Sequence, residues 1–365
     1  MTDSATRTIL IAGTDESSGK TAIGLALGRI AERREFTVGY MKPRGTRLQS
    51  NVGKTLDQDP MLAREVLDIQ AEMHEMEPIV YSPTFIEEVI RGREKPAALA
   101  DRVRESHEHL QKGRDLMLIE GASAASTGAI IDMTDENLAD LLDADVVLVA
   151  PYEEIRDTDG VLSYAQAVSD RLAGVIFNGI PSETIDALDS DIIPFLEERG
   201  VPVLGVIPRV RELAGVTVAT LASELGAEVV TETPTDAYVE RFMVGAMGGE
   251  NALRHFRRAH DAVVVTGGDR ADIITAALEA PGVRAVVLTG GINPPGRVVA
   301  SAEERDVPLL RVRSETVVTI DRIESIIRSG RTRDLETVEV MERLLLDHAD
   351  VDALIPKKPP EPGNG

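Results

Sequence analysis

The sequence contains no cysteine and no tryptophan, and aromatic residues make up only 3% of it. The absence of cysteine excludes disulfide bonds, thiolate metal sites and a cysteine nucleophile. The sequence also lacks an apolar run of the roughly 18 residues that a membrane-spanning helix needs. Its first residues show neither a basic region nor a small-residue cleavage site, so we expect no signal peptide, no membrane association and a cytoplasmic protein.

Basic residues are scarce relative to acidic ones, with 39 Lys and Arg against 62 Asp and Glu and a net charge of −23. Only seven of the bases are lysine. A nucleic-acid-binding protein normally presents a basic face, so this class of partner is disfavoured. An acidic, lysine-poor surface is typical of halophilic proteins, because concentrated salt screens the self-repulsion. We expect salt adaptation, although an ordinary acidic cytoplasmic protein fits the same charge.

Short apolar runs without clean alternation recur along the first part of the chain, and amphipathic stretches separate them. Such runs predict strands that are covered on both faces. Strand and helix in repetition predict an α/β fold with a doubly wound, mostly parallel sheet. We expect strands at Thr8–Ala12, Thr37–Met41, Leu116–Glu120, Val146–Ala150, Gly174–Asn178 and Val203–Ile207, and helices at Lys20–Arg33, Ala97–Lys112 and Ile185–Arg199.

A second, shorter α/β series follows a predicted helix at Val216–Gly226. The pattern predicts a first α/β domain over residues 1–215, which the loop described next makes a P-loop nucleotide-binding domain. It also predicts a smaller α/β domain over residues 216–335, and a terminal helix with a disordered tail over residues 336–365. In the second domain we expect strands at Ala262–Thr266, Ala285–Thr289 and Leu309–Val312, and helices at Arg270–Ala280, Ala300–Arg305 and Thr319–Ser329.

The stretch GTDESSGKT, residues 13–21, follows the first predicted strand and opens the first predicted helix. This context predicts a phosphate-binding loop, in which backbone N–H groups surround phosphate oxygens. Lys20 would reach the terminal phosphates, and Thr21 would offer its hydroxyl to Mg²⁺. The alternative is a glycine turn that carries an incidental lysine.

The loop has five residues between its first glycine and the Gly-Lys pair, one more than the usual pattern. It resembles the GTDTxVGKT loop of dethiobiotin synthetase, which has the same spacing, although Ser18 stands where that family has valine. The resemblance implies a site for ATP and Mg²⁺. It assigns nucleotide binding to Gly13, Thr14, Asp15, Glu16, Ser17, Ser18, Gly19, Lys20 and Thr21.

Two further strand ends on the amino-terminal side of this domain carry candidate residues, and ligands of doubly wound sheets bind beyond such ends. Lys42 follows the second strand, where the resemblance places a lysine beside the γ-phosphate and the substrate, so Lys20 and Lys42 are the candidate catalytic residues. A solvated turn lysine is the alternative for Lys42. Asp57 and Asp59 precede a predicted helix, either as capping acids or, for Asp59, as the metal ligand that the resemblance implies.

Two later strand ends complete the predicted site. Glu120 ends the apolar strand in LIEGAS, where dethiobiotin synthetase has EGAGG, and the resemblance makes it a metal ligand together with Thr21 and Asp59. Ser123 replaces a glycine there, which puts the substrate side of the loop in question. Asn178 ends the fifth strand, where the family places an asparagine that reads the adenine base, although a turn asparagine is the alternative.

The second half of the chain resembles the non-catalytic N-terminal region of long phosphotransacetylases, which joins a dethiobiotin-synthetase-like domain to a DRTGG domain. The resemblance rests on Gly268-Asp269-Arg270 with Asp272, and on Leu288-Thr289-Gly290-Gly291. It implies a homo-oligomer formed through the DRTGG domain. The two glycine-rich strand ends are read as tight turns or an interface, or else as a site for a small anion or nucleotide.

Three functions follow from these patterns. The first is a stand-alone regulatory or scaffold protein that binds Mg-ATP, partners an enzyme of acyl-CoA or acyl-phosphate metabolism, and by family analogy transfers no acetyl group itself. The second is an ATP-dependent carboxylase–cyclase, a ligase of the dethiobiotin synthetase type. The third is a structural partner whose nucleotide site has lost its role.

Overall fold

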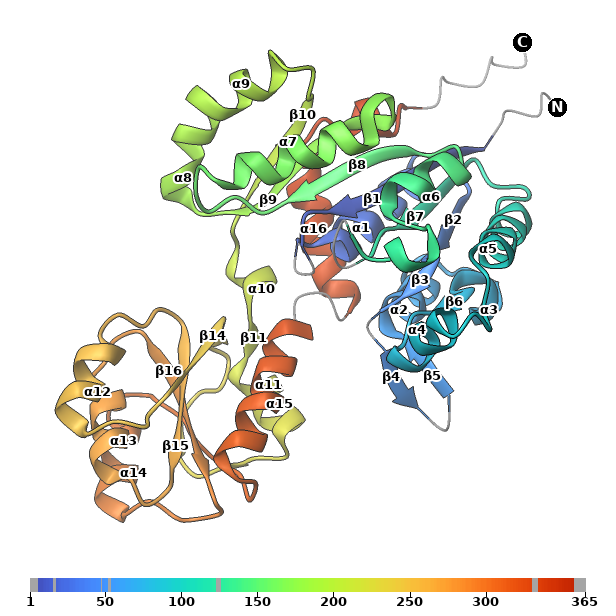
Figure 1. The fold of residues 1–365 in the computed structure, drawn as a ribbon. Coiled ribbons are helices and arrows are strands. Elements are labelled where there is room, and N and C mark those ends of the chain that lie inside the picture. The colour runs from blue at the N-terminus through green and yellow to red at the C-terminus, as the bar shows by residue number, and fades with distance from the viewer. Residues whose placement is uncertain are drawn as a thin grey trace, which may run out of the picture. The chain divides into compact units, whose positions relative to one another are not determined.

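The computed structural model describes residues 6–15, 18–46, 48–51, 54–122, 126–329 and 334–357. The chain forms two units. Unit 1 comprises Met1–Arg209 together with Asp334–Gly365, and unit 2 comprises Val210–Arg333 (Figure 1). Each unit is an α/β structure, as the sequence predicts. No helix within the described ranges is long and apolar enough to cross a membrane.

Unit 1 is built on a parallel sheet whose strands are buried because their apolar runs are covered on both faces. In the strand order β10-β9-β8-β1-β7-β2, β1 lies in the interior of the sheet and pairs with β8 on one side and β7 on the other. The strands are β1 (Arg7–Gly13), β2 (Val38–Met41), β7 (Leu116–Glu120), β8 (Asp145–Ala150), β9 (Leu172–Ile180) and β10 (Val203–Pro208).

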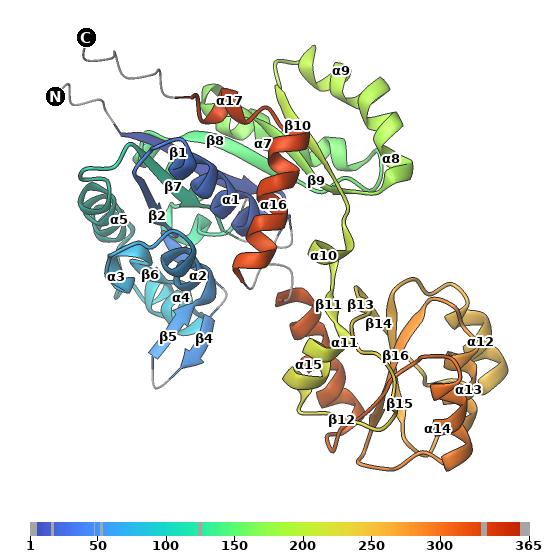
Figure 2. The same ribbon diagram turned by 180° about the vertical axis from the view of Figure 1, so that it is seen from behind.

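Helices cover both faces of this sheet. On one face α1 (Lys20–Arg33) lies beside α16 (Leu335–His348), which comes from the other end of the chain (Figure 2). On the opposite face lie α6 (Asp135–Leu141) and α7 (Asp157–Val168) (Figure 1). Other helices are α5 (Pro96–Leu110), α8 (Ser182–Ala187), α9 (Ile193–Glu197) and α17 (Val351–Leu354). The predicted helix at Ile185–Arg199 is interrupted by a π-helical turn at Leu188–Ile192.

The segment between β2 and α5 folds into small elements that the sequence analysis did not predict, apart from the helix after Asp59. These are β3 (Arg44–Gly45) paired with β6 (Ile79–Val80), the hairpin β4 (Leu48–Asn51) and β5 (Lys54–Asp57), and the helices α2 (Gln58–Val66), α3 (Met73–Met76) and α4 (Pro83–Ile90). The segment returns Asp57 to the end of β2, which sets up the site described below.

Unit 2 has a five-stranded sheet of order β12-β17-β16-β15-β14, in which only β12 is antiparallel. The strands are β12 (Glu228–Val229), β14 (Arg241–Val244), β15 (Ala262–Gly267), β16 (Val283–Thr289) and β17 (Leu309–Arg311), with a separate pair β11 (Val216–Thr217) and β13 (Tyr238–Val239).

Two apolar clusters hold this second sheet. One lies under α12 (Gly249–Phe256), α13 (Ala271–Leu278) and α14 (Gly296–Glu303), and the other under α11 (Val218–Leu225) and α15 (Thr316–Ser329) (Figure 1). The helix predicted from Val216 begins at Val218, because Thr217 acts as its N-cap and accepts a hydrogen bond from the Thr220 N–H. A short helix, α10 (Arg211–Ala214), precedes it.

Helix α16 docks on α1 through an apolar face and one buried carboxylate. Val338, Met341 and Leu345 are at most 2% exposed. Glu342, which is 3% exposed, accepts from Arg29 at 3.1 Å and from Arg33 at 2.7 Å. The C-terminal segment is therefore an integral part of the first core.

We predict that Leu345→Ala lowers the free energy of unfolding by about 2–5 kcal/mol, because it removes a fully buried side chain and leaves a cavity. Leu346→Ala is the matched control, since the neighbouring leucine is 50% exposed and should cost less than about 0.5 kcal/mol. Urea unfolding followed by circular dichroism measures both. Equal losses for the two variants would contradict the docking of α16.

Candidate functional site

The predicted phosphate loop lies between β1 and α1, at the carboxyl end of an interior strand. Gly19 precedes the helix at φ +92°, a left-handed conformation that favours glycine. A Cβ on Gly13 would lie 2.8 Å from Lys20 Nζ, so Gly13 leaves the space that the lysine occupies. Glu16 and Ser17, which the sequence also assigned to nucleotide binding, lie outside the described residues.

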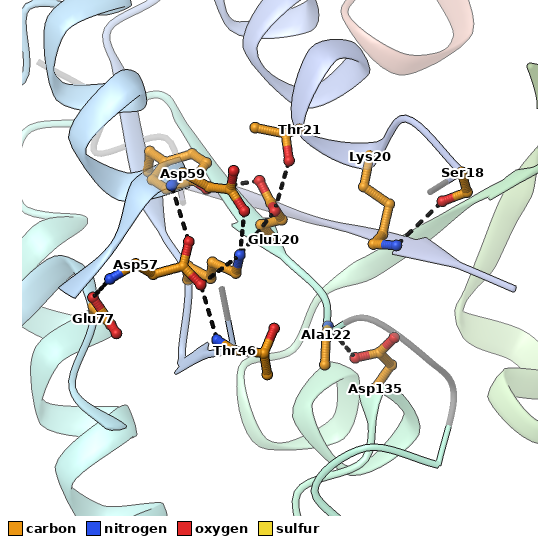
Figure 3. Close-up of polar contacts among 12 residues, drawn as sticks. Ser18, Lys20, Thr21, Thr46, Asp57, Asp59, Glu77, Glu120, Ala122 and Asp135 are labelled. Atoms are coloured by element: carbon orange, nitrogen blue, oxygen red, sulfur yellow. Dashed lines mark hydrogen bonds and ion pairs between the residues drawn. The ribbon is translucent and has the colours of Figure 1, made fainter. Parts of the chain in front are cut away.

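Lys20 lies within the loop rather than in solvent. Its Nζ donates to Ser18 Oγ at 3.2 Å (Figure 3). It also donates to the Asp15 carbonyl at 2.6 Å. Burial lowers the pKa of Lys20, and the nearby Glu120, Asp135 and Asp15 only partly oppose this effect. The nearby carboxylates therefore do not fully compensate the burial of this ammonium, which suits a group that binds anionic oxygens.

Lys42 is the centre of a buried charge cluster at the ends of β2 and β7. Its Nζ lies 2.9 Å from Asp57 and 3.4 Å from Glu120, and it also pairs with Asp59. All four side chains are at most 4% exposed. Burial lowers the pKa of Lys42, but Glu120, Asp59 and Asp57 together raise it well above its ordinary value. Lys42 is therefore a buried ammonium ion.

Glu120 connects this cluster to the phosphate loop. Thr21 Oγ1 donates to Glu120 Oε1 at 2.9 Å, and the Tyr40 hydroxyl donates to Oε2 at 2.7 Å (Figure 3). Burial raises the pKa of Tyr40, and Glu120 and Asp59 add to the effect, so Tyr40 remains a hydrogen-bond donor. The structure thus brings Thr21, Lys42, Asp59 and Glu120 together, as the sequence analysis expected of strand ends.

Asp57 is the N-cap of α2, one of the roles considered for the two acids here, whereas Asp59 lies in the first turn of the helix and not before it. The Asp57 side chain caps the helix by accepting from the Asp59 N–H at 2.9 Å, and it also faces Lys42. Glu77 supports it from α3 by accepting from the Asp57 N–H at 2.9 Å. Glu77 Oε1 is buried and has no hydrogen-bond partner among the described residues. Burial raises the pKa of Glu77 to about 7, although the hydrogen bond from the Asp57 N–H opposes this effect.

A second buried ion pair, between Arg44 and Asp135, was missed by the sequence analysis. Arg44 also donates to the carbonyls of Thr127 and Met133, and Asp135 accepts from Tyr164 at 3.0 Å. Asp135 accepts in addition from the Ala122 N–H at 3.3 Å (Figure 3). The network holds both ends of the segment that follows Glu120. The only signal in the sequence is that Arg44 comes directly after Lys42-Pro43. Ser123 lies outside the described residues.

Asn178 lies against the phosphate loop. Its Nδ2 donates to the Ser18 carbonyl at 2.8 Å, and a Cβ on Gly19 would collide with it. The side chain therefore positions the loop from the end of β9. Adenine reading by Asn178 stays a prediction.

Two oxygen donors of the site, from Thr21 and Glu120, suit Mg²⁺. The part of the chain that the structure describes contains no group of three or more His, Asp or Glu side chains arranged to hold a metal, and Asp57, Asp59 and Glu120 converge on Lys42 instead. Mg²⁺ commonly takes one or two protein oxygens and completes its shell with water and phosphate. Thr21 and Glu120, already 2.9 Å apart, are the pair that fits.

Comparison with known families agrees with this geometry. An AAA domain matches residues 7–230, and a DRTGG domain matches residues 220–326. The chain belongs to the AAA domain family. Its phosphate-loop domain is thus followed by a DRTGG domain, the combination that the sequence predicts.

Three kinds of relative match this AAA domain protein. The phosphate acetyltransferase of Haemophilus influenzae is 22% identical over 95% of this chain and 52% of its own length. The dethiobiotin synthetase of Bacillus subtilis subsp. natto is 26% identical over 59% of this chain and 91% of its own. The probable cobyric acid synthase of Methanothermobacter thermautotrophicus is 32% identical over 55% and 44%.

The chain spans about half the length of the phosphate acetyltransferases that it matches. Among solved structures, the cell division protein MinD of Aquifex aeolicus matches 57% of this chain and 84% of its own, with 18% identity and a TM-score of 0.35.

We predict that Glu77→Gln becomes more stable relative to wild type as the pH rises. The folded-state pKa of about 7 exceeds the ordinary value of 4.5, so the native wild type binds a proton more tightly than the unfolded chain and loses stability as the pH rises between these values. The gain should approach about 3 kcal/mol above pH 7. Urea unfolding at several pH values measures it. The exposed Glu65→Gln is the control, and a pH-independent difference for Glu77→Gln would contradict the assignment.

Proposed function

We propose that unit 1 binds Mg-ATP at the phosphate loop. The observation that carries the proposal is the buried Lys20, held by two loop oxygens next to the Thr21–Glu120 pair. Phosphate oxygens can replace the Asp15 carbonyl and the Ser18 hydroxyl as hydrogen-bond acceptors. Their negative charge would also compensate the positive charge of the buried ammonium.

Each residue of the site has a defined part in this proposal. The loop N–H groups and Lys20 bind the phosphates, and Asn178 keeps the loop in place through the Ser18 carbonyl. Thr21 and Glu120 hold Mg²⁺, which neutralises charge on the phosphate oxygens. Lys42 fixes the Glu120 carboxylate on the metal side.

We further propose that the protein acts as a regulatory or scaffold component linked to acyl-phosphate or acyl-CoA metabolism. Support comes from the phosphate acetyltransferases, which match 92–95% of this chain, both units included. Binding of Mg-ATP to unit 1 would then change the behaviour of unit 2 or of an enzyme partner. Oligomerisation through unit 2 and a cytoplasmic, high-salt setting belong to the same proposal, the latter supported by the charge of −23.

We predict that Lys20→Ala weakens Mg-ATP binding by about 10- to 100-fold, the effect of losing charge-assisted hydrogen bonds to phosphate. Lys112→Ala removes the same charge from an exposed position and should bind like wild type. Titration calorimetry in molar KCl measures the affinities. Unchanged binding by Lys20→Ala would show that the assigned site is wrong.

The second candidate is an ATP-dependent ligase of the dethiobiotin synthetase type. The observation that favours it is the position of Lys42, a buried ammonium 3.4 Å from the Glu120 that bonds Thr21, where it could stabilise charge on a moving phosphoryl group. The observation against it is that three carboxylates already hold that ammonium.

We predict binding of ATP without substrate-dependent turnover. Phosphate release would be followed with Mg-ATP alone, with diaminopelargonic acid, with bicarbonate, and with both. If release rises only with the pair, and is lost in Lys20→Ala, the chain is a ligase and the regulatory proposal fails.

A further inference from the structure

The carboxyl edge of the sheet in unit 2 carries a group of arginines that the Mg-ATP proposal does not use. Arg311 ends β17, Arg313 follows it, and Arg322 reaches the same place from α15. Together with Gly291 and Ser314 they line a hollow of about 620 Å³. Ligands of open α/β sheets bind at this edge, and pockets for small molecules have about this volume.

The charge of this hollow is unusual for the molecule. Three guanidinium groups line it against one carboxylate, Glu228, whereas acids exceed bases by 62 to 39 in the whole chain. Glu228 pairs with Arg311 from an exposed position, its side chain 65% accessible. The lining therefore keeps a net charge of about +2, from three arginines and one glutamate, in a protein of net charge −23.

The three arginines differ in their present partners. Arg311 pairs with Glu228 and Asn293, and Arg322 donates to the carbonyls of Leu225 and Glu224 at the end of α11. These contacts fix the two side chains at the rim. Arg313 is exposed and makes no hydrogen bond or ion pair with any described residue, so its whole donor set is available.

The backbone beside the arginines leaves room for a ligand. Gly290 and Gly291 turn away from the end of β16 at φ +81° and +68°, and neither carries a side chain into the space. The Gly290 and Gly291 N–H groups bond to the Ser314 and Val312 carbonyls, which joins the turn to the segment that bears Arg313. The hollow thus combines a hydrogen-bonded glycine turn, two arginines with partners in the described residues, and Arg313, which has none there.

We propose that this hollow in unit 2 is a binding site for a small molecule that carries a phosphate group or phosphate chain, recognised by Arg311, Arg313 and Arg322. Guanidinium groups bind phosphate through paired, charge-assisted hydrogen bonds. A ligand with two or more negative charges neutralises the lining. The site is separate from the phosphate loop of unit 1 and needs no metal ion.

The test uses the full chain carrying Lys20→Ala, with a chelator that removes divalent cations. Under these conditions the phosphate loop of unit 1 should contribute little to the binding of triphosphate. The probe is sodium triphosphate, titrated by calorimetry at constant ionic strength, with sodium sulfate as the comparison anion. We expect saturable binding of triphosphate, at least about tenfold weaker in the added variant Arg313→Ala. Arg313 is chosen because it makes no internal contact that folding requires.

Arg258→Ala is the matched control, since it removes the same charge from an exposed position near the start of β15, at the opposite edge of the sheet. It should leave triphosphate binding unchanged. The proposal is overturned if no saturable binding occurs, if Arg258→Ala weakens binding as much as Arg313→Ala, or if sulfate binds as tightly as triphosphate.

Discussion

The structure of the site depends on one buried cation. Lys42 holds the carboxylates of Asp57 and Asp59, which lie at the junction of β5 and α2, and of Glu120 at the end of β7. All three carboxylates have almost no contact with water. A buried charge is tolerated only when it is paired and hydrogen-bonded. Without this ammonium, the three carboxylates would repel one another. This repulsion would disfavour the packing of the segment between β2 and α5 against the end of the sheet. The cluster therefore stabilises both the site and the segment between β2 and α5 (the inserted segment).

The phosphate loop is coupled to that cluster through Glu120. This carboxylate accepts from Thr21 at the start of α1 and from Tyr40 in β2, so the loop, β2 and β7 share one hydrogen-bonded group. Arg44 and Asp135 clamp the segment beyond Glu120 from the other side. A ligand bound at the loop, as proposed, would act on Glu120 and through it on Lys42, which contacts Asp57 in the inserted segment.

The sequence predicts the local elements well and the distant contacts poorly. Apolar runs locate the strands of the unit 1 sheet, and helix α1 matches its predicted bounds, because these signals lie within one element. The pairing of Arg44 with Asp135, which are 91 residues apart, has no such signal. Nor does the docking of α16 on α1, where Glu342 meets Arg29. The strands of the inserted segment have two to four residues, too few to show a period.

The proposed sites in units 1 and 2 both lie at strand ends but differ in the charge of their lining. In unit 1, Lys20 and Lys42 stand beside Asp57, Asp59 and Glu120, so the lysines do not offset the acids. A nucleotide, which is itself anionic, needs a divalent cation to approach such a site. In the hollow of unit 2, three arginines stand against one glutamate, so the proposed anion would bind without a metal ion. Removal of Mg²⁺ should therefore separate the two sites, abolishing the first and sparing the second.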